Sequence, residues 1–109
     1  MTQLIERSCH KVDPDQGPLE GDQIGELSAQ VPDWEIEDEE RIWRTFEFEN
    51  FAQALAFVNR IGELAEHQRH HPDISLSWGM VRVELSTHSI GGLSENDFIV
   101  AAKIDQLPR

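Results

Sequence analysis

The sequence predicts an α+β domain in which a four-stranded antiparallel sheet carries its helices on one face. Two segments of alternating apolar and polar residues, 34–48 and 74–85, each predict a pair of strands. Between them, apolar residues recur at spacings of three and four from residue 51 onward, which predicts a long amphipathic helix. Shorter helical patterns stand before the first pair and after the second, so the predicted order is α-β-β-α-β-β-α.

The N-terminal 22 residues are polar and contain two prolines and two glycines, which predicts a flexible arm. A chain of 109 residues has the length of one domain, and we place that domain at residues 23–109. Its first helix is expected between Ile24 and Val31, because apolar residues there recur at helical spacing and Pro32 follows.

Apolar and polar residues alternate from Trp34 onward, which predicts the first strand. The acidic residues 37–40 predict the turn that follows it. In the next strand Ile42 and Phe46 share one face. The second pair of strands is expected at 74–78 and 81–85, joined by a short turn at Gly79 and Met80.

Asn50, followed three residues later by Gln53, is typical of a helix start. Pro72 is expected to stop this helix and to hold His71 in extended geometry, because a residue before proline avoids the helical region. The apolar stripe of the helix is expected to consist of Phe51, Ala54, Leu55, Val58, Ile61, Leu64 and Ala65. A last helix is expected to start at Ser94, since an acid stands three residues later, as in a capping box.

The formal net charge of −12 argues against direct binding to nucleic acid or to an anionic membrane, because like charges repel. Cys9 is the single cysteine, so no disulfide can form within the chain. No apolar run has transmembrane length, and no secretory signal pattern stands at the start. We therefore expect a cytoplasmic protein.

Within residues 66–97 we single out three histidines and two carboxylates as candidate site residues: His70, His71, His88, Glu66 and Asp97. Histidine titrates near neutral pH, so clustered imidazoles can take up and return protons. Glu66 shares a helical face with His70 and could hold its imidazole, although a plain surface ion pair explains the same spacing. Asp97 could equally be only the third residue of a capped helix.

A metal site is a weaker interpretation of the cluster. Histidine and carboxylate groups are good ligands for zinc or iron, but His70 and His71 are adjacent and no HExxH-type pair is present. No nucleophile-elbow pattern for a serine hydrolase occurs either. We therefore expect no metal.

The run Glu66-x-x-x-His70-His71-Pro72, with Trp78, His88 and Asp97 after it, resembles the signature of the pterin-4a-carbinolamine dehydratases. The resemblance extends over about residues 24–107. It includes Pro32-Asp33-Trp34 and Thr87-His88-Ser89-Ile90-Gly91-Gly92-Leu93-Ser94, which are similar to the bacterial branch.

This resemblance implies the α+β fold described above, assembled as a homodimer or homotetramer. It also implies loss of water from a 4a-hydroxytetrahydropterin to give quinonoid dihydropterin, without a metal or other cofactor. Such an enzyme recycles the cofactor of aromatic amino acid hydroxylases, one of which could be a partner. By resemblance, His70 and His88 would transfer protons, and His71 would mainly position the substrate.

Four further residues are expected to bind or orient groups in the pterin site. Glu66 and Asp97 would orient imidazoles or bind polar ring edges, Thr87 belongs to the same motif, and Trp34 would offer an apolar wall.

A non-catalytic protein-binding module on the same fold is the main alternative, because some members of the family serve as dimerisation cofactors or assembly factors. A binding role would require an exposed apolar helical face.

Overall fold

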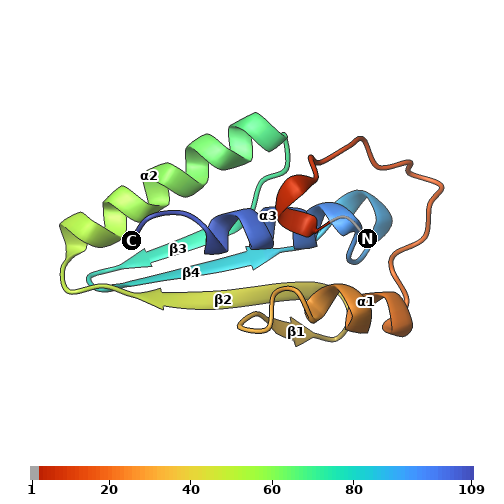
Figure 1. Cartoon of the computed structure of the whole chain (residues 1–109), viewed down its shortest axis with the longest axis horizontal. Coiled ribbons are helices and arrows are strands. Elements are labelled where there is room, and N and C mark those ends of the chain that lie inside the picture. The colour runs from red at the N-terminus through yellow and green to blue at the C-terminus, as the bar shows by residue number, and fades with distance from the viewer. Residues whose placement is uncertain (1–2) are drawn as a thin grey trace.

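A four-stranded antiparallel sheet in the order β1-β2-β4-β3 lies at the centre of the computed structural model, which describes residues 3–109. The strands are β1 (Glu35–Glu37), β2 (Arg41–Glu47), β3 (Asp73–Ser77) and β4 (Met80–Leu85). The helices are α1 (Gly21–Ser28), α2 (Phe51–Gln68) and α3 (Glu95–Asp105), with short 3-10 turns η1 (Leu4–Glu6) and η2 (His88–Ile90). Figure 1 shows α2 and α3 together over the sheet. The predicted fold class is confirmed.

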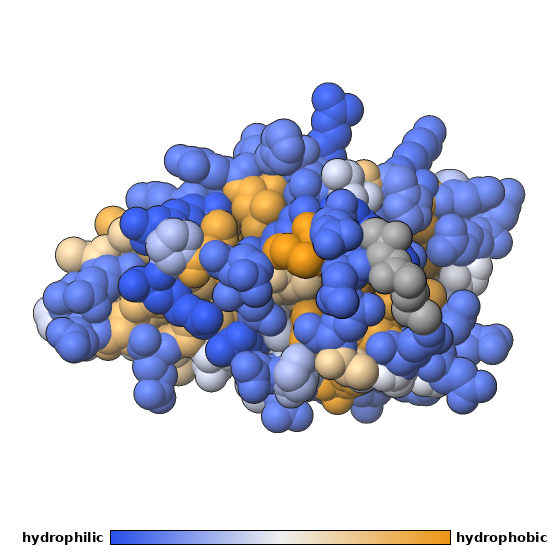
Figure 2. Space-filling model, in the orientation of Figure 1, coloured by the Kyte–Doolittle hydropathy of each residue, from blue (hydrophilic) through white to orange (hydrophobic). Residues whose placement is uncertain are grey.

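The alternation in the strands divides the sheet into an apolar face and a polar face. On the apolar face Ile42 pairs with Leu85 and Phe46 with Val81, and all four are buried. Helix α3 lies within the same core, because Phe98 and most of the residues after it are fully buried. On the outer surface, Figure 2 shows mainly hydrophilic side chains, with apolar ones visible in separate patches.

Helix α2 starts where the sequence predicts. The Asn50 side chain accepts a hydrogen bond from the backbone N–H of Gln53 at 2.9 Å, which satisfies one of the free donors of the first turn. The buried face differs in part from the predicted stripe: Phe57 belongs to it, whereas Phe51 and Leu55 are each 41% exposed. Phe57 packs against the rings of Phe46 and Phe48.

The prediction that Pro72 stops α2 is corrected, because the helix already ends at Gln68. Arg69 adopts a left-handed conformation with φ of 56°, and this reverses the chain direction. The carbonyl of Ala65 accepts hydrogen bonds from the N–H groups of both Arg69 and His70, the pattern of a helix C-terminal cap. His70 therefore lies outside the helix rather than in its last turn.

The N-terminal segment, defined here as residues 3–11, lies against α3. Leu4 is buried in the core, the Nζ group of Lys103 donates to the carbonyl of Ile5, and Arg7 forms an ion pair with Glu95 at 2.9 Å. The predicted mobility of residues 1–22 remains a prediction, but these contacts attach the segment to the domain. Helix α1 also begins at Gly21, two residues before the predicted domain boundary.

Within residues 3–109, no helix is both long and apolar enough to span a membrane.

Candidate active site

His70 and Asp97 form the central contact of the site, although they stand 27 residues apart in the chain. The Nε2 atom of His70 lies 2.6 Å from Oδ1 of Asp97. The His70 side chain is 13% exposed and that of Asp97 is fully buried. The reversal at Arg69 brings His70 to the start of α3, so the partner of His70 is Asp97. The expected pairing of His70 with Glu66 is wrong, because that pairing needed His70 to continue the helix.

Asp97 accepts two more hydrogen bonds through its second oxygen. Oδ2 receives the hydroxyl of Thr87 at 2.8 Å and the backbone N–H of Ser94 at 2.9 Å. Because Thr87 donates its one hydroxyl proton to Asp97, its Oγ1 must accept the hydrogen bond from the Ser94 hydroxyl, over 2.7 Å. Because Oδ2 accepts from two donors, we assign Asp97 as the carboxylate that accepts the Nε2–H of His70.

The capping role expected for Asp97 is thus present together with its contact to a histidine. The sequence offered both interpretations separately, and the structure combines them. The buried hydroxyl of Ser94 is the part of this network that the sequence analysis did not assign to the site.

His71 lies on the exposed side of the same loop. Its Nε2 atom is 2.5 Å from Oε2 of Glu66, and both side chains are largely exposed. Glu66 therefore contacts His71, the neighbour of the histidine for which it was expected. An exposed pair of this kind holds the ring only loosely, since solvent competes for both groups.

His88 opens the turn η2 directly after Thr87, so the backbone places it next to the Asp97 network. Its side chain is exposed and lines a cleft of about 220 Å³ together with Thr87, Arg41 and Glu84. Arg41 donates a hydrogen bond to Glu37, which raises the pKa of Arg41, and its ion pairs with Glu37, Glu40 and Glu84 offset its positive charge in this cleft.

Two glycines shape the loop that carries His88. Gly91 has a φ of 69°, a conformation in which side chains other than glycine are strained. A Cβ on Gly92 would lie 2.7 Å from the Cβ of Pro18, so only glycine allows this close approach. The two glycines therefore allow the loop to close, and the closed loop determines the backbone position of His88.

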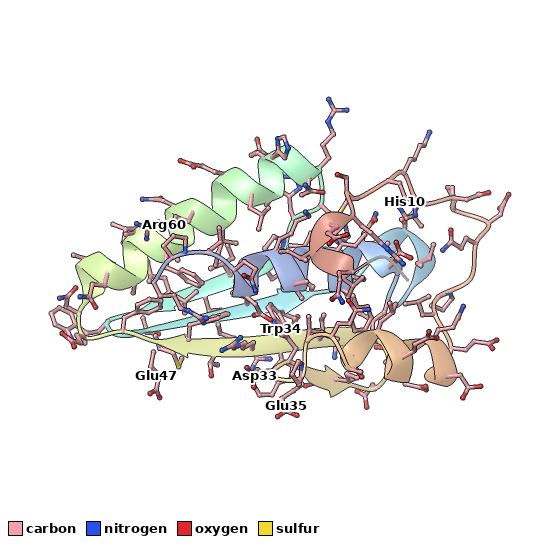
Figure 3. The ribbon with its side chains drawn as sticks, in the orientation of Figure 1. His10, Asp33, Trp34, Glu35, Glu47 and Arg60 are labelled. Carbon is pink, nitrogen blue, oxygen red and sulfur yellow. The ribbon has the colours of Figure 1, made fainter. Side chains whose placement is uncertain are left out.

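Trp34 is not brought together with the histidines. It is 5% exposed, and its indole N–H donates to Asp105 at 2.9 Å, near the C-terminal end of α3 (Figure 3). Asp97 lies eight residues earlier on that helix, which corresponds to about 12 Å along its axis. Trp34 stabilises the core and the edge of the sheet in this structure. Its expected role as a wall of the site remains a prediction.

The site therefore offers one imidazole fixed by a buried carboxylate and two exposed imidazoles nearby. Such a set can deliver a proton and remove another at neutral pH. Among residues 3–109, no group of three or more histidine, cysteine or acidic side chains is arranged to hold a metal ion.

Comparison with known proteins gives the family of the chain. The family model described as pterin 4 alpha carbinolamine dehydratase matches residues 17–107. The chain belongs to this dehydratase family. A relative from Rubrobacter xylanophilus is 48% identical over 98% of this chain and all of its own length. One from Methylococcus capsulatus is 51% identical over 95% of this chain and 92% of its own. The names of both relatives assign them only provisionally as pterin-4-alpha-carbinolamine dehydratases.

Two solved structures share the dehydratase fold. A transcriptional coactivator/pterin dehydratase from Brucella melitensis is 31% identical, with a TM-score of 0.76 over 82% of this chain and 96% of its own. A pterin dehydratase-like protein identified as a RuBisCO assembly factor in the alpha-carboxysome is 24% identical, with a TM-score of 0.57 over 66% of this chain and 84% of its own. The second comparison concerns the fold alone.

Proposed function

We propose that the protein removes water from 4a-hydroxytetrahydropterin to give quinonoid dihydropterin, by acid and base catalysis with His70, His88 and His71. Membership of the dehydratase family supports the substrate class. The observation that carries the proposal is the 2.6 Å contact between His70 Nε2 and the buried carboxylate of Asp97. A buried, fully hydrogen-bonded acid fixes both the orientation and the tautomer of that imidazole.

The reaction needs one proton delivered and one removed. The C4a–O bond breaks as the 4a-hydroxyl receives a proton and leaves as water. The electron pair of the new C=N bond comes from the ring nitrogen next to C4a, and a proton is lost from a nitrogen of the pterin. The protein therefore ends the cycle with the same number of protons as at the start, but on different groups.

The tautomer of His70 follows from its partner. Because Nε2–H donates to Asp97, Nδ1 is the nitrogen left for the substrate. In the neutral ring Nδ1 accepts a proton, and in the charged ring it donates one while Asp97 stabilises the charge. His88 would carry the complementary transfer from its exposed position beside Thr87, and His71, in contact with Glu66, would position the pterin.

The test is the dehydration of 4a-hydroxytetrahydropterin generated in place by a phenylalanine hydroxylase and followed by ultraviolet absorbance. We expect wild-type protein to exceed the spontaneous rate. His70→Ala and His88→Ala should each lose at least about a hundredfold in kcat, the usual contribution of a positioned acid or base. Asn59→Ala, on the exposed surface of α2, is the control and should keep the wild-type rate.

Wild-type turnover in the double variant His70→Ala/His88→Ala would exclude this site. No acceleration by folded wild-type protein would exclude the proposed enzyme.

We extend the proposal to assembly and partners. The sheet ends at β3, whose outer edge has no strand beside it in the described chain, and pairing with a second copy would satisfy its free backbone groups. A homodimer or homotetramer in the cytoplasm, acting beside an aromatic amino acid hydroxylase, is the assembly that this function implies.

A protein-binding role is the second candidate, and one observation favours it. Phe51 and Leu55, four residues apart on α2, are each 41% exposed, and Trp78 in the β3–β4 turn is 72% exposed. The N–H of Phe48 donates to the carbonyl of Gly79, so this turn lies at the same end of the molecule as the start of α2. An inactive but folded protein in the dehydration assay would favour this role.

A further inference from the structure

We propose that the chain contains a second site, a cleft that binds a small anion bearing phosphate or carboxylate groups. The basic cleft, as we call it, has a volume of about 490 Å³. It lies between residues 8–11 of the N-terminal segment and residues 67–69 at the end of α2. This inference concerns a separate ligand and does not depend on the dehydratase activity.

The charge of the basic cleft is opposite to that of the whole chain. Four of its seven lining residues are histidine, lysine or arginine, namely His10, Lys11, His67 and Arg69, and none is acidic. The chain has 21 acidic residues and only 9 lysines and arginines. An anion would therefore meet four basic side chains and no acidic one in the lining of this cleft.

Three carboxylates on the elements that adjoin the basic cleft contact other groups. Glu66 contacts His71, Glu95 pairs with Arg7, and Asp97 contacts His70. By contrast, neither Lys11 nor Arg69 has a carboxylate oxygen within 4.0 Å among residues 3–109. The two permanent cations of the basic cleft are thus available to a ligand.

The backbone conformation of Arg69 is the second argument. A left-handed residue directly after a helix is usually glycine, because a Cβ is strained there. The chain carries arginine at this position with φ of 56°. Strained residues of this kind cluster at functional sites. Here the side chain of the strained residue lines the basic cleft.

Cys9, which also lines the basic cleft, adds no opposing charge. Burial raises the pKa of its thiol to about 11, so the group is neutral at pH 7. The backbone N–H of Cys9 is bound to Gln68 and that of His10 to Asn96, so the wall of the cleft is fixed before a ligand arrives.

A different explanation assigns these cations to α2 itself. The C-terminal end of a helix carries partial negative charge, and basic residues near it are favourable without any ligand. That explanation covers His67 and Arg69 but does not require Lys11, which comes from a remote part of the chain. On that explanation, replacing these basic residues would lower the stability of the protein, and no anion would bind to it. The experiment therefore distinguishes the two explanations.

The experiment is a titration of 15N-labelled protein at pH 7 and low salt, with inorganic phosphate in one arm and citrate in the other. We expect saturable shifts of the backbone signals of residues 8–11 and 67–69. Arg69→Ala and Lys11→Ala should each weaken binding at least tenfold. Arg60→Ala, which removes the same charge from the middle of α2 (Figure 3), is the matched control and should bind as the wild type does.

Binding of phosphate alone would assign a phosphoryl ligand, and binding of citrate alone a carboxylate ligand. The absence of saturable shifts in both arms would overturn the proposal. An equal loss of affinity in Arg60→Ala would also overturn it, because attraction would then be unspecific. All the substituted side chains are exposed, so the variants should fold, and the titration contains no pterin, so it stands apart from the dehydration assay.

Discussion

Asp97 accepts hydrogen bonds from three separate parts of the chain: His70 after α2, Thr87 after β4, and Ser94 at the start of its own helix. A fully buried carboxylate is costly unless its acceptor positions are filled. Here the donors fill them, and one donor is the proposed catalytic imidazole. At the scale of residues, the site is therefore organised by its acid, and the histidine is placed by that acid.

Arg69 leads to a prediction about stability. Replacing it with glycine should raise the free energy of unfolding by about 1 kcal/mol, because glycine tolerates the left-handed conformation without the steric penalty of a Cβ. Urea denaturation measures this change. The same substitution should weaken phosphate or citrate binding, so stability and binding would move in opposite directions.

Arg69→Ala is the matched comparison for that prediction. Alanine removes the guanidinium but retains the Cβ, so it should lose anion binding without gaining stability. An equal gain in stability for both variants would show that charge repulsion, rather than backbone strain, is relieved.

At the scale of elements, the N-terminal segment joins the end of α2 to the start of α3. The Asn96 side chain, which is buried, pairs with the backbone of His10 in both directions: Nδ2 donates to the carbonyl at 2.6 Å and Oδ1 accepts from the N–H at 3.1 Å. The Gln68 side chain accepts from the N–H of Cys9. Asn96 stands one residue before Asp97 and Gln68 two residues before His70, so both contacts lie next to the site.

Asn96→Ala should release this segment. We expect the amide hydrogens of Cys9 and His10 to exchange at least about tenfold faster, and the unfolding free energy to fall by about 1–2 kcal/mol, for two lost hydrogen bonds. Hydrogen exchange followed by NMR measures the first effect. Gln106→Ala, at the far end of α3, should leave the exchange of both amides unchanged. Unaltered exchange in Asn96→Ala would mean that other contacts hold the segment.

Elements whose signals are local could be predicted from the sequence. The start of α2 is determined by Asn50 and Gln53, three residues apart, and the strand pairs by alternation over a few residues. The end of α2 could not be predicted, because it depends on a left-handed arginine, which sequence preference disfavours. The packing of Leu4 could not be predicted either, since a single apolar residue in a polar segment shows no periodicity.

At the scale of the whole molecule, the open edge of β3 leads to a prediction about assembly. Ser75→Lys should shift the protein toward the monomer, because symmetric pairing across this edge would bring two like charges together. Analytical ultracentrifugation measures the shift. The control is Thr45→Lys, because Thr45 and Ser75 both flank Arg82 in one row of the sheet, but Thr45 lies two strands from the β3 edge. An equal effect of both substitutions would exclude pairing through β3.

The composition of the site was predictable from the sequence, but its pairing was not. His70, His71, Glu66 and Asp97 were all singled out by residue type and spacing. Which carboxylate contacts which histidine depends on how the whole chain closes, because the acid beside His70 comes from 27 residues further on. Helical spacing favoured Glu66 for His70, and the reversal after α2 gave Glu66 to His71 instead.

The double use of Asp97 has a consequence for how such a protein could evolve. A lineage that no longer needed the chemistry could change His71 and His88 freely, since both side chains are exposed. It could not discard the acid as easily, because the same carboxylate caps α3 and holds Thr87 and Ser94. Loss of activity and loss of the acid would therefore be separate events, and a descendant used only for binding would keep Asp97 as a trace of its ancestry.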